Sequence, residues 1–169
     1  MEYINYDKSS DFKQYILNDL MAIIDKCYEL SVPVFYFAAV SNNATHTQYE
    51  GYELNPSTFG MTLTRDVSKS FPAVELKGVE YPPKTNVNNH FNKQATLNEK
   101  LEKSLDYLQS VHYMLNIPFM LMIPFSNNDE NTKYLGRQIF PKNKNINLAD
   151  DKFHKLLLEL TGLNKQMEY

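Results

Sequence analysis

Cysteine, glycine, arginine and tryptophan are scarce in this sequence of 169 residues. The single cysteine, Cys27, excludes an intramolecular disulfide and indicates a reducing compartment. The five glycines form no glycine-rich phosphate-binding motif. The longest apolar runs, 32–40 and 117–125, have nine residues each, whereas a bilayer span needs roughly 20. The N-terminus resembles no signal peptide. We therefore expect a soluble cytoplasmic protein that does not associate with membranes.

The sequence has no excess of basic residues, because its net charge is −3 and its isoelectric point is near 5.8. A nucleic-acid-binding protein needs a basic surface that neutralises phosphates, so we do not expect a nucleic-acid partner. Lysines in the C-terminal part alternate with acidic residues, which is typical of a solvated surface. Tyrosine and phenylalanine are abundant, with 12 and 10 copies, and they supply material for a sizeable core.

Sequence motifs of common enzymes are missing from the chain. It contains no His-Glu-x-x-His, no nucleophile elbow and no cysteine and histidine spacing for zinc. We therefore predict no cofactor and no metal site, and the sequence leaves open whether the protein catalyses a reaction.

An internal repeat is the most informative feature of the sequence. The segment Ser-Asn-Asn-x-x-x-Thr-x-Tyr-x-Gly occurs at 41–51 and again 85 residues later, at 126–136. Residues 28–66 match residues 113–151 at 12 of 39 positions without a gap, where unrelated segments would share roughly two or three. We interpret the repeat as a duplication followed by divergence.

Each copy has the pattern of a helix followed by two strands and a second helix. Apolar residues recur at helical spacing over 12–30 and 97–115, and a proline follows each stripe. Ser9, Ser10 or Asp11 can cap the first helix, and Thr96 and Glu99 have the spacing of a capping box for the second. The runs 34–40 and 119–125 predict strands buried on both faces, with an edge or a bulge at Pro124.

The strands 47–54 and 132–140 alternate and follow polar residues, so we predict two hairpins with long loops. The second helix is expected at 150–160, ending at Gly162, while Pro72 breaks or displaces its counterpart at 66–76. The predicted fold is therefore α+β, an internal duplication of an α-β-β-α unit. Its two pseudo-twofold-related halves surround antiparallel β-hairpins flanked by helices. The repeats occupy 1–83 and 97–169, with a linker at 84–96, and together form one compact domain.

The repeated polar segments are the strongest candidates for a site. One interpretation is that both copies need the same turn, which serine and asparagine favour. The other is that the two loops converge across the pseudo-twofold axis and form one polar binding site. For a ligand or partner we single out Ser41, Asn42, Asn43, Thr47, Tyr49, Ser126, Asn127, Asn128, Thr132, Tyr134 and Arg137.

Most other titratable residues have a structural explanation. His112 lies on an apolar helical stripe, so we expect a hydrogen-bonded core histidine, and Cys27 is expected to be a buried thiol. Asp66 and Asp151 repeat near helix starts, where the helix dipole favours negative charge. Arg137 is most simply a surface ion-pair residue. His46 and Glu50 are interpreted as solvated loop residues, although an acid–base role remains open.

Three functions are compatible with these observations, and the third of them is a structural subunit of an oligomer. The first is a small intracellular binding protein of bacterial, phage or mobile-element origin, whose partner is another protein. The alternative is an enzyme or sensor with a small-molecule pocket between the two repeats, in which Tyr49, Tyr134, Arg137, His46 or Glu50 take part.

Overall fold

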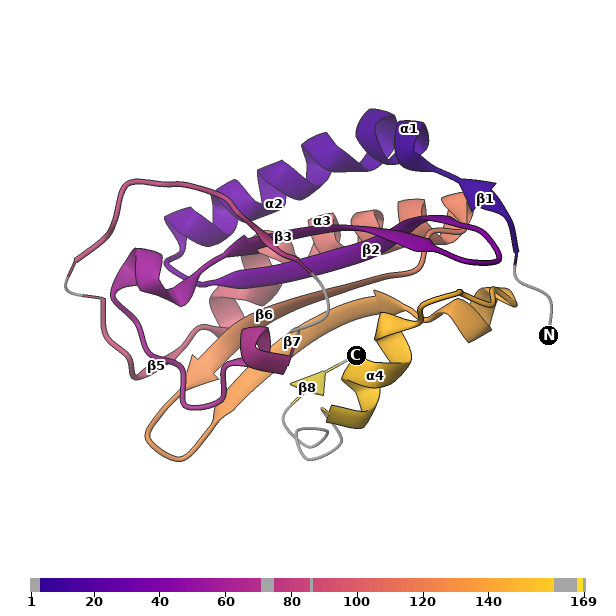
Figure 1. Ribbon diagram of the computed structural model, residues 1–169. Helices are drawn as coiled ribbons and strands as arrows, with labels where there is room; N and C mark the ends of the chain where they lie inside the picture. Colours follow the sequence, from indigo (N-terminus) through magenta and orange to yellow (C-terminus); the bar gives the residue numbers. More distant parts are fainter. Residues whose placement is uncertain (1–3, 71–74, 86, 160–166, 169) are drawn as a thin grey trace.

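The computed structural model describes residues 4–70, 75–85, 87–159 and 167–168. The chain is mixed α+β, as expected, and its central sheet has the strand order β4-β3-β2-β6-β7-β8, with β1 beside β2 and β5 beside β6 (Figure 1). No helix in these described ranges is long and apolar enough to cross a membrane.

Two long helical segments precede the two hairpins. The elements in chain order are β1 (Tyr6–Asp7), α1 (Ser9–Asp11), the π-helical turn η1 (Phe12–Ile16), α2 (Leu17–Glu29), β2 (Val34–Asn42), β3 (Thr47–Leu54), the 3₁₀ turns η2 (Pro56–Phe59) and η3 (Val67–Ser70), β4 (Lys77–Gly78), β5 (Phe91–Asn92), α3 (Gln94–Leu115), β6 (Phe119–Asn127), β7 (Thr132–Ile139), η4 (Pro141–Lys144), α4 (Lys152–Glu159) and β8 (Met167–Glu168).

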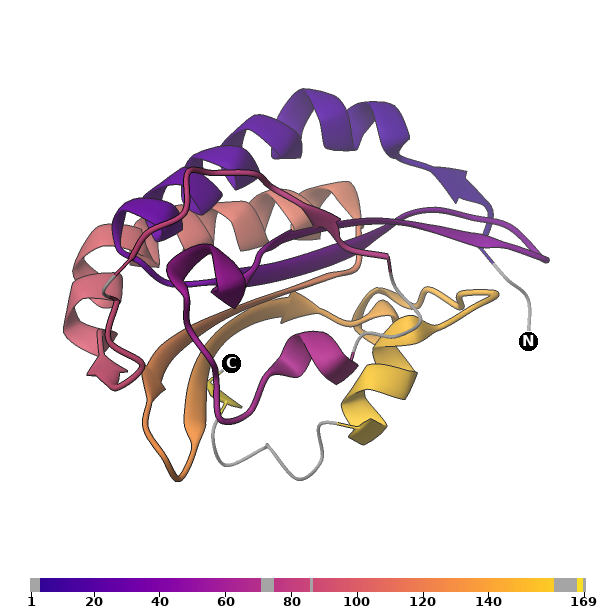
Figure 2. The same cartoon turned by 60° about the vertical axis from the view of Figure 1, so that its left-hand side comes forward.

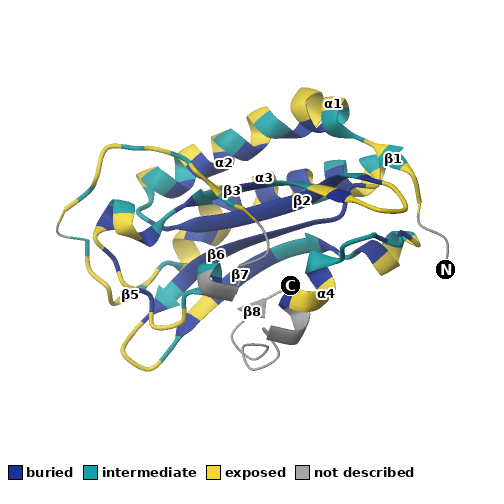
Figure 3. Cartoon of the chain, viewed as in Figure 1, coloured by how far each residue is buried: buried dark blue, intermediate teal, exposed yellow. Residues whose placement is uncertain are grey.

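The central strands β2 and β6 are covered on both faces. Helices α2 and α3 lie on one face of the sheet, and η3 and α4 lie on the other (Figures 1 and 2). Eight of the nine residues of β2 and of β6 are buried, at equivalent positions in each strand (Figure 3). The prediction of strands buried on both faces is therefore confirmed, and it explains why both runs are continuously apolar.

Strands β2 and β6 pair antiparallel through their first residues. Phe35 lies opposite Met122, Tyr36 opposite Leu121, and Phe37 opposite Met120. Because only the starts of the strands pair, their far ends extend in opposite directions. The two hairpin turns consequently lie at opposite ends of the molecule (Figure 1).

The two hairpins share one register. Asn42 pairs with Thr47 and Asn127 pairs with Thr132, so each loop has four residues and the predicted long loops are wrong. Each hairpin contains a bulge, between Ala39 and Ser41 and between Pro124 and Ser126. The bulge expected at Pro124 is confirmed, and the first hairpin bends at the equivalent position without a proline.

The helix starts differ from the predicted caps. Helices α1 and α3 begin at Ser9 and Gln94, so the expected caps lie inside the helices, and the box expected at Thr96 does not cap α3. The side chains of Asp7 and Asn92 instead accept hydrogen bonds from the N–H groups of Ser9 and Gln94, at 3.0 and 3.2 Å. These two residues belong to β1 and β5, so strand pairing positions each cap.

The second helix of each copy differs between the halves. Asp151 accepts the N–H of His154 at the start of α4, and Asp66 accepts the N–H of Ser68 at the start of η3. Both aspartates therefore stand at the start of a helical segment, as their repetition indicated. In the first copy the segment is the 3₁₀ turn η3 (Val67–Ser70). The predicted stop at Gly162 lies outside the described residues.

Candidate functional site

Asn42 at the end of β2 binds backbone groups of the N-terminal segment and of the other half of the chain. Its amide nitrogen donates to the carbonyl oxygens of Ile4 and Asn147, at 2.8 and 3.1 Å. Its amide oxygen accepts the N–H of Ala149 at 3.0 Å and the hydroxyl of Thr47 at 2.7 Å. All of the hydrogen-bonding capacity of this buried side chain is thus used within the protein.

Thr47 and Tyr49 on β3 extend the same contact. The hydroxyl oxygen of Thr47 accepts the N–H of Asp150 at 2.9 Å. The phenol of Tyr49 accepts the N–H of Lys152 at 2.9 Å and donates to the carbonyl of Asp150 at 2.5 Å. We call Asn42, Thr47 and Tyr49 the first clamp, because the three side chains hold the backbone that leads into α4.

Asn127 makes the corresponding contacts at the end of β6. Its amide nitrogen donates to the carbonyl of Asn89 at 2.7 Å and to that of Thr62 at 3.4 Å. Its amide oxygen accepts the N–H of Thr64 at 3.1 Å and the hydroxyl of Thr132 at 2.6 Å. These partners are the residues 85 positions away from the partners of Asn42.

Thr132 and Tyr134 complete a second clamp with Asn127. Thr132 accepts the N–H of Arg65 at 2.9 Å, and Tyr134 accepts the N–H of Val67 at 3.2 Å and donates to the carbonyl of Arg65. The second clamp therefore holds the backbone that leads into η3 of the first half. Each clamp thus binds backbone groups of the other half, through side chains that stand at equivalent positions of the sequence repeat.

Burial shifts the pKa values of the two clamp tyrosines. Desolvation raises the pKa of the Tyr49 and Tyr134 phenols far above the ordinary value, although backbone N–H groups act in the opposite direction. Both phenols consequently stay neutral at physiological pH and act as fixed hydrogen-bond donors and acceptors.

The loops between the clamp residues are ordinary turns. The side chain of Asn43 accepts the N–H groups of Thr45 and His46, and that of Asn128 accepts those of Glu130 and Asn131. Ser41 donates to the side chain of Gln48 at 3.1 Å. Ser126, at the equivalent position of β6, pairs with Asn92 of β5.

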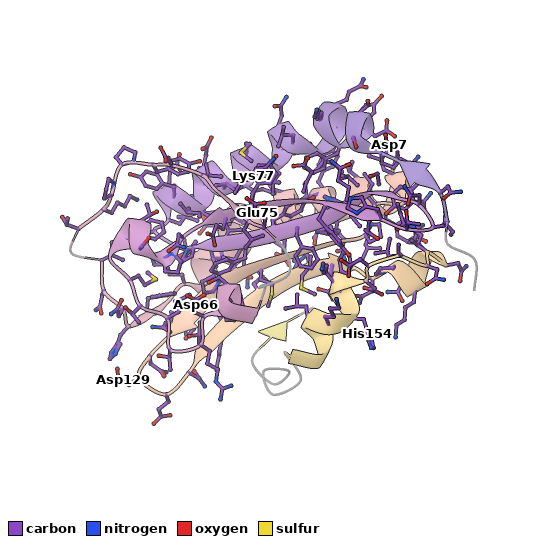
Figure 4. The ribbon with its side chains drawn as sticks, viewed as in Figure 1. Asp7, Asp66, Glu75, Lys77, Asp129 and His154 are labelled. Carbon is purple, nitrogen blue, oxygen red and sulfur yellow. The ribbon has the colours of Figure 1, made fainter. Side chains whose placement is uncertain are left out.

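The two loops lie far apart. Asn42 and Asn127 each stand six residues beyond the central pair Tyr36–Leu121, in opposite directions, which separates them by roughly 40 Å along the strands. Figure 4 shows the same separation, because Asp7 lies near the first loop and Asp129 at the tip of the second. The structure therefore does not bring the two segments together into one site.

Arg137 faces away from both clamps. Its Nε donates to Asp106 on α3 at 3.2 Å and its Nη1 to the carbonyl of Gly136 at 2.9 Å. The ion pair with Asp106 joins β7 to α3, which confirms the interpretation of Arg137 as an ion-pair residue. His46 is exposed, and Glu50 accepts hydrogen bonds from Tyr52 and Lys77, both at 3.3 Å. Within the described ranges, no group of three or more His, Cys, Asp or Glu could hold a metal ion.

His112 is a buried, fully hydrogen-bonded histidine. Its Nδ1 lies 2.7 Å from the carbonyl of Leu108, which can only accept, so Nδ1 carries the proton. Its Nε2 therefore accepts from the hydroxyl of Tyr36, at 2.7 Å. Desolvation lowers the pKa of His112 to about 4, against a weaker effect of the Leu108 carbonyl, and desolvation raises the pKa of Tyr36.

The residues equivalent to this polar pair are apolar. Cys27 stands 85 positions before His112, and Leu121 stands 85 positions after Tyr36; both are completely buried. Burial raises the pKa of the Cys27 thiol well above its ordinary value, which keeps it protonated and unreactive. The centre of the core thus differs in chemistry between the two halves.

Sequence reasoning missed the outer surface of the helices. A groove of about 380 Å³ lies between α2 and α3, lined by Asp19, Ala22, Ile23, Lys26, Lys100, Leu101, Lys103, Ser104 and Tyr107. A second hollow, of about 420 Å³, lies at the end of α3 and is lined by Gln109, Ser110, Tyr113, Met114 and Ile139. The available signal was that Tyr107, Tyr113 and Met114 fall outside the apolar stripe of α3.

Neither a protein-family model, nor a curated protein, nor a solved structure matches this chain.

Proposed function

We propose that this protein is a small intracellular binding protein, whose partner is another protein that docks on the outer surface of α3. The repeated polar segments serve the fold rather than the partner, because their clamp side chains bind backbone groups of the opposite half, and Asn43 and Asn128 stabilise local turns.

The exposed apolar side chains of α3 carry this proposal. Tyr107, Tyr113 and Met114 are 60%, 57% and 77% exposed, and all three project from one helix. Single exposed apolar residues are ordinary, but a series of them beside two hollows is typical of a protein-binding surface. Tyrosine and methionine are also enriched in interfaces. Four of the five large exposed apolar side chains of the described chain lie on the two helical segments.

The groove between α2 and α3 adds lysine side chains to the docking surface. Its floor includes Ile23 and Leu101, and its rim carries Lys26, Lys100 and Lys103 against a single acidic residue, Asp19. Lys26 pairs with Glu29 at 2.8 Å, and Lys100 lies 3.8 Å from Glu99. The three lysines that line the groove, two of which lie beside glutamates outside its lining, can bind acidic side chains of a partner at this position.

Site-specific photo-cross-linking tests the docking surface. A photoreactive residue in place of Tyr107 is expected to capture the same partner repeatedly from a lysate of the source cells. The Ala22→Trp change should fill the groove and reduce this capture at least fivefold. A photoreactive residue at the exposed Lys142 serves as a control and should not give the same product.

If Tyr107 and Lys142 captured the same proteins, or if Ala22→Trp left the Tyr107 product unchanged, α3 would not be the docking surface. Ala22 is exposed, so Ala22→Trp should leave the thermal unfolding midpoint unchanged, and that measurement guards against a folding defect.

The small-molecule alternative retains one supporting observation. The groove between α2 and α3 lies between the two halves of the chain, as that function requires, although Tyr49, Tyr134, Arg137, His46 and Glu50 do not line it. Its lysines favour an anionic ligand. Titration with inorganic phosphate and with citrate, followed by amide chemical shifts of α2 and α3, tests it, and unchanged shifts at millimolar concentrations would reject it.

We also propose that the fold arose by duplication of an α-β-β-α unit, with the halves related by a pseudo-twofold axis. Three observations support this. In the β2–β6 pairing, replacing each residue by its counterpart 85 positions away leaves the pair Tyr36–Leu121 unchanged and turns the pair Phe35–Met122 into Phe37–Met120. Ser31 and Asn116 share a left-handed backbone, with φ of 57° and 56°, and the clamps match bond for bond. Exchanging the loops 42–47 and 127–132 should therefore preserve stability, and loss of cooperative unfolding would contradict the equivalence.

A further inference from the structure

The C-terminal end of α2 is covered by a strap, residues 79–84. The ring of Tyr81 stacks on that of Tyr28, with centroids 4.5 Å apart and planes 16° apart, and its hydroxyl donates to Asp25. The hydroxyl of Tyr28 in turn donates to the carbonyl of Pro82 at 2.7 Å. An aromatic ring followed by a proline thus occupies this end of the helix.

Lys84 at the end of the strap occupies a position over the helix terminus. Its ammonium lies 4.4 Å from the centre of the Tyr28 ring and donates to the Tyr28 carbonyl at 2.6 Å and to Ser31 at 3.1 Å. A cation here offsets the partial negative charge of the last helical carbonyls. The strap therefore contributes a ring, a proline and a charge.

The end of α3 has the same backbone but lacks a strap among the described residues. The residues equivalent to Tyr28, Asp25, Glu29 and Ser31 are Tyr113, Ser110, Met114 and Asn116, and a residue with a left-handed backbone follows each helix, Ser31 after α2 and Asn116 after α3. Where the strap covers Tyr28, the hollow of about 420 Å³ opens beside Tyr113. β8 does not take the place of β4, because it pairs with Tyr134 and Leu135, three residues earlier in the hairpin than the pairs of β4.

The charge at this hollow is supplied by the protein itself. The ammonium of Lys144 lies 3.5 Å from the centre of the Tyr113 ring, so the cation over the ring is already present. A lysine at the fourth position of an incoming segment, equivalent to Lys84, would meet Lys144 with like charge. A glutamate or aspartate there would meet it with opposite charge.

We propose that the hollow at the end of α3 binds an extended segment of a partner protein with the pattern Tyr-Pro-x-Glu or Tyr-Pro-x-Asp. The tyrosine ring stacks on Tyr113 as Tyr81 stacks on Tyr28, and its hydroxyl reaches Ser110. The proline lies over the Tyr113 hydroxyl, and the carboxylate pairs with Lys144. This inference rests on the proposed function, because it names the chemistry of the partner at one end of the same helix.

Two short peptides test the proposal on the full chain. The first is the strap sequence Val-Glu-Tyr-Pro-Pro-Lys-Thr, and the second replaces its lysine by glutamate, Val-Glu-Tyr-Pro-Pro-Glu-Thr. Fluorescence anisotropy is expected to show binding of the glutamate peptide, about threefold tighter than the lysine peptide, as a partly screened ion pair allows. Amide shifts should change at Ser110, Tyr113 and Met114. The internal strap, residues 79–84, is part of the same chain and therefore has a high effective concentration at Tyr28, so neither peptide should displace it.

Charge reversal gives the sharpest test. Lys144→Glu should invert the preference, so that the lysine peptide binds more tightly than the glutamate peptide. Tyr113→Ala should weaken both peptides at least tenfold, whereas Tyr15→Ala, which removes an exposed tyrosine of η1 outside the hollow, should leave both affinities unchanged.

The results that would overturn the proposal are distinct from those that test the proposed function. No binding at millimolar peptide, binding that survives Tyr113→Ala, or a preference that Lys144→Glu does not invert would each reject this segment. If Tyr107 still captured a partner in the cross-linking experiment, the binding function would stand and only the partner chemistry at this hollow would fall.

Discussion

The two clamps are alike in every hydrogen bond, whereas the core between them and the ends of the two helices are not. Asn42 and Asn127 bind equivalent backbone groups, but Tyr36–His112 corresponds to Leu121–Cys27, and the strapped Tyr28 corresponds to the open Tyr113. A side chain that satisfies buried backbone groups has few substitutes, because any replacement leaves those groups without partners. Apolar packing and exposed surface allow more variety, so the halves differ there.

Removing either clamp amide should have the largest effect. Asn42→Ala and Asn127→Ala each leave a partly buried N–H and the hydroxyl of a buried threonine without their acceptor, which should lower the free energy of unfolding by about 3 kcal/mol. Urea denaturation measures both. Asn98→Ala, at an exposed position of α3, is the control and should change stability by less than about 0.5 kcal/mol. A difference of more than about 2 kcal/mol between the two clamp variants would show that the clamps are not equivalent.

Acid should lower the stability of the protein through the buried His112. The pKa of His112 is about 4 in the folded protein and near 6.5 in the unfolded chain, so between these values only the unfolded state binds the proton. Stability should therefore decrease as the pH falls from 6.5 to 4, by about 3 kcal/mol from this residue. Denaturation curves at several pH values measure it.

A double variant sharpens the same comparison. Tyr36→Leu with His112→Cys gives the centre the residues of the other half, and it should remove the His112 contribution to the acid dependence while lowering stability at pH 7. His154→Gln, at an exposed position, should retain the acid dependence. An unchanged slope between pH 6.5 and 4 in the double variant would mean that another group causes it.

Gly51 and Gly78 should respond differently to the same change. A Cβ on Gly51 would lie 2.8 Å from the Leu76 side chain and 2.9 Å from the Glu75 carbonyl oxygen, whereas nothing lies within 4 Å of one on Gly78. Gly51→Ala should therefore lower the unfolding free energy by about 2 kcal/mol. Gly78→Ala should change it by less than about 0.5 kcal/mol. Equal effects would mean that Glu75 and Leu76 can move away from the added methyl group without lowering the free energy of unfolding.

The two helix ends should show the smallest difference. Tyr28→Ala removes the stacking with Tyr81 and the hydrogen bond to Pro82, and should lower the free energy of unfolding by about 1.5 kcal/mol. Tyr113→Ala removes only the contact with Lys144 and exposed area, and should cost less than about 0.5 kcal/mol. Thermal unfolding compares them, and an equal loss would mean that Tyr113 packs as tightly as Tyr28.

Local patterns in the sequence predicted most elements of the fold. The stripes of α2 and α3, the buried runs of β2 and β6, and the buried histidine were predictable, because periodicity and runs of apolar residues reflect burial directly. The helix caps were not, because Asp7 and Asn92 reach their positions through pairing of β1 and β5 with distant strands. The loop lengths also depended on the hairpin register, which polar residues do not reveal.

The sequence by itself determined that Asn42, Thr47 and Tyr49 matter together with their counterparts 85 residues later. A repeated polar residue, however, has the same appearance whether it binds a ligand or a backbone. Only the tertiary structure decided between these roles, through the antiparallel pairing of β2 with β6 that separates the two loops and brings each clamp to the opposite half. Contacts between residues about 100 positions apart arise from the packing of whole elements, and they leave no local periodicity in the chain.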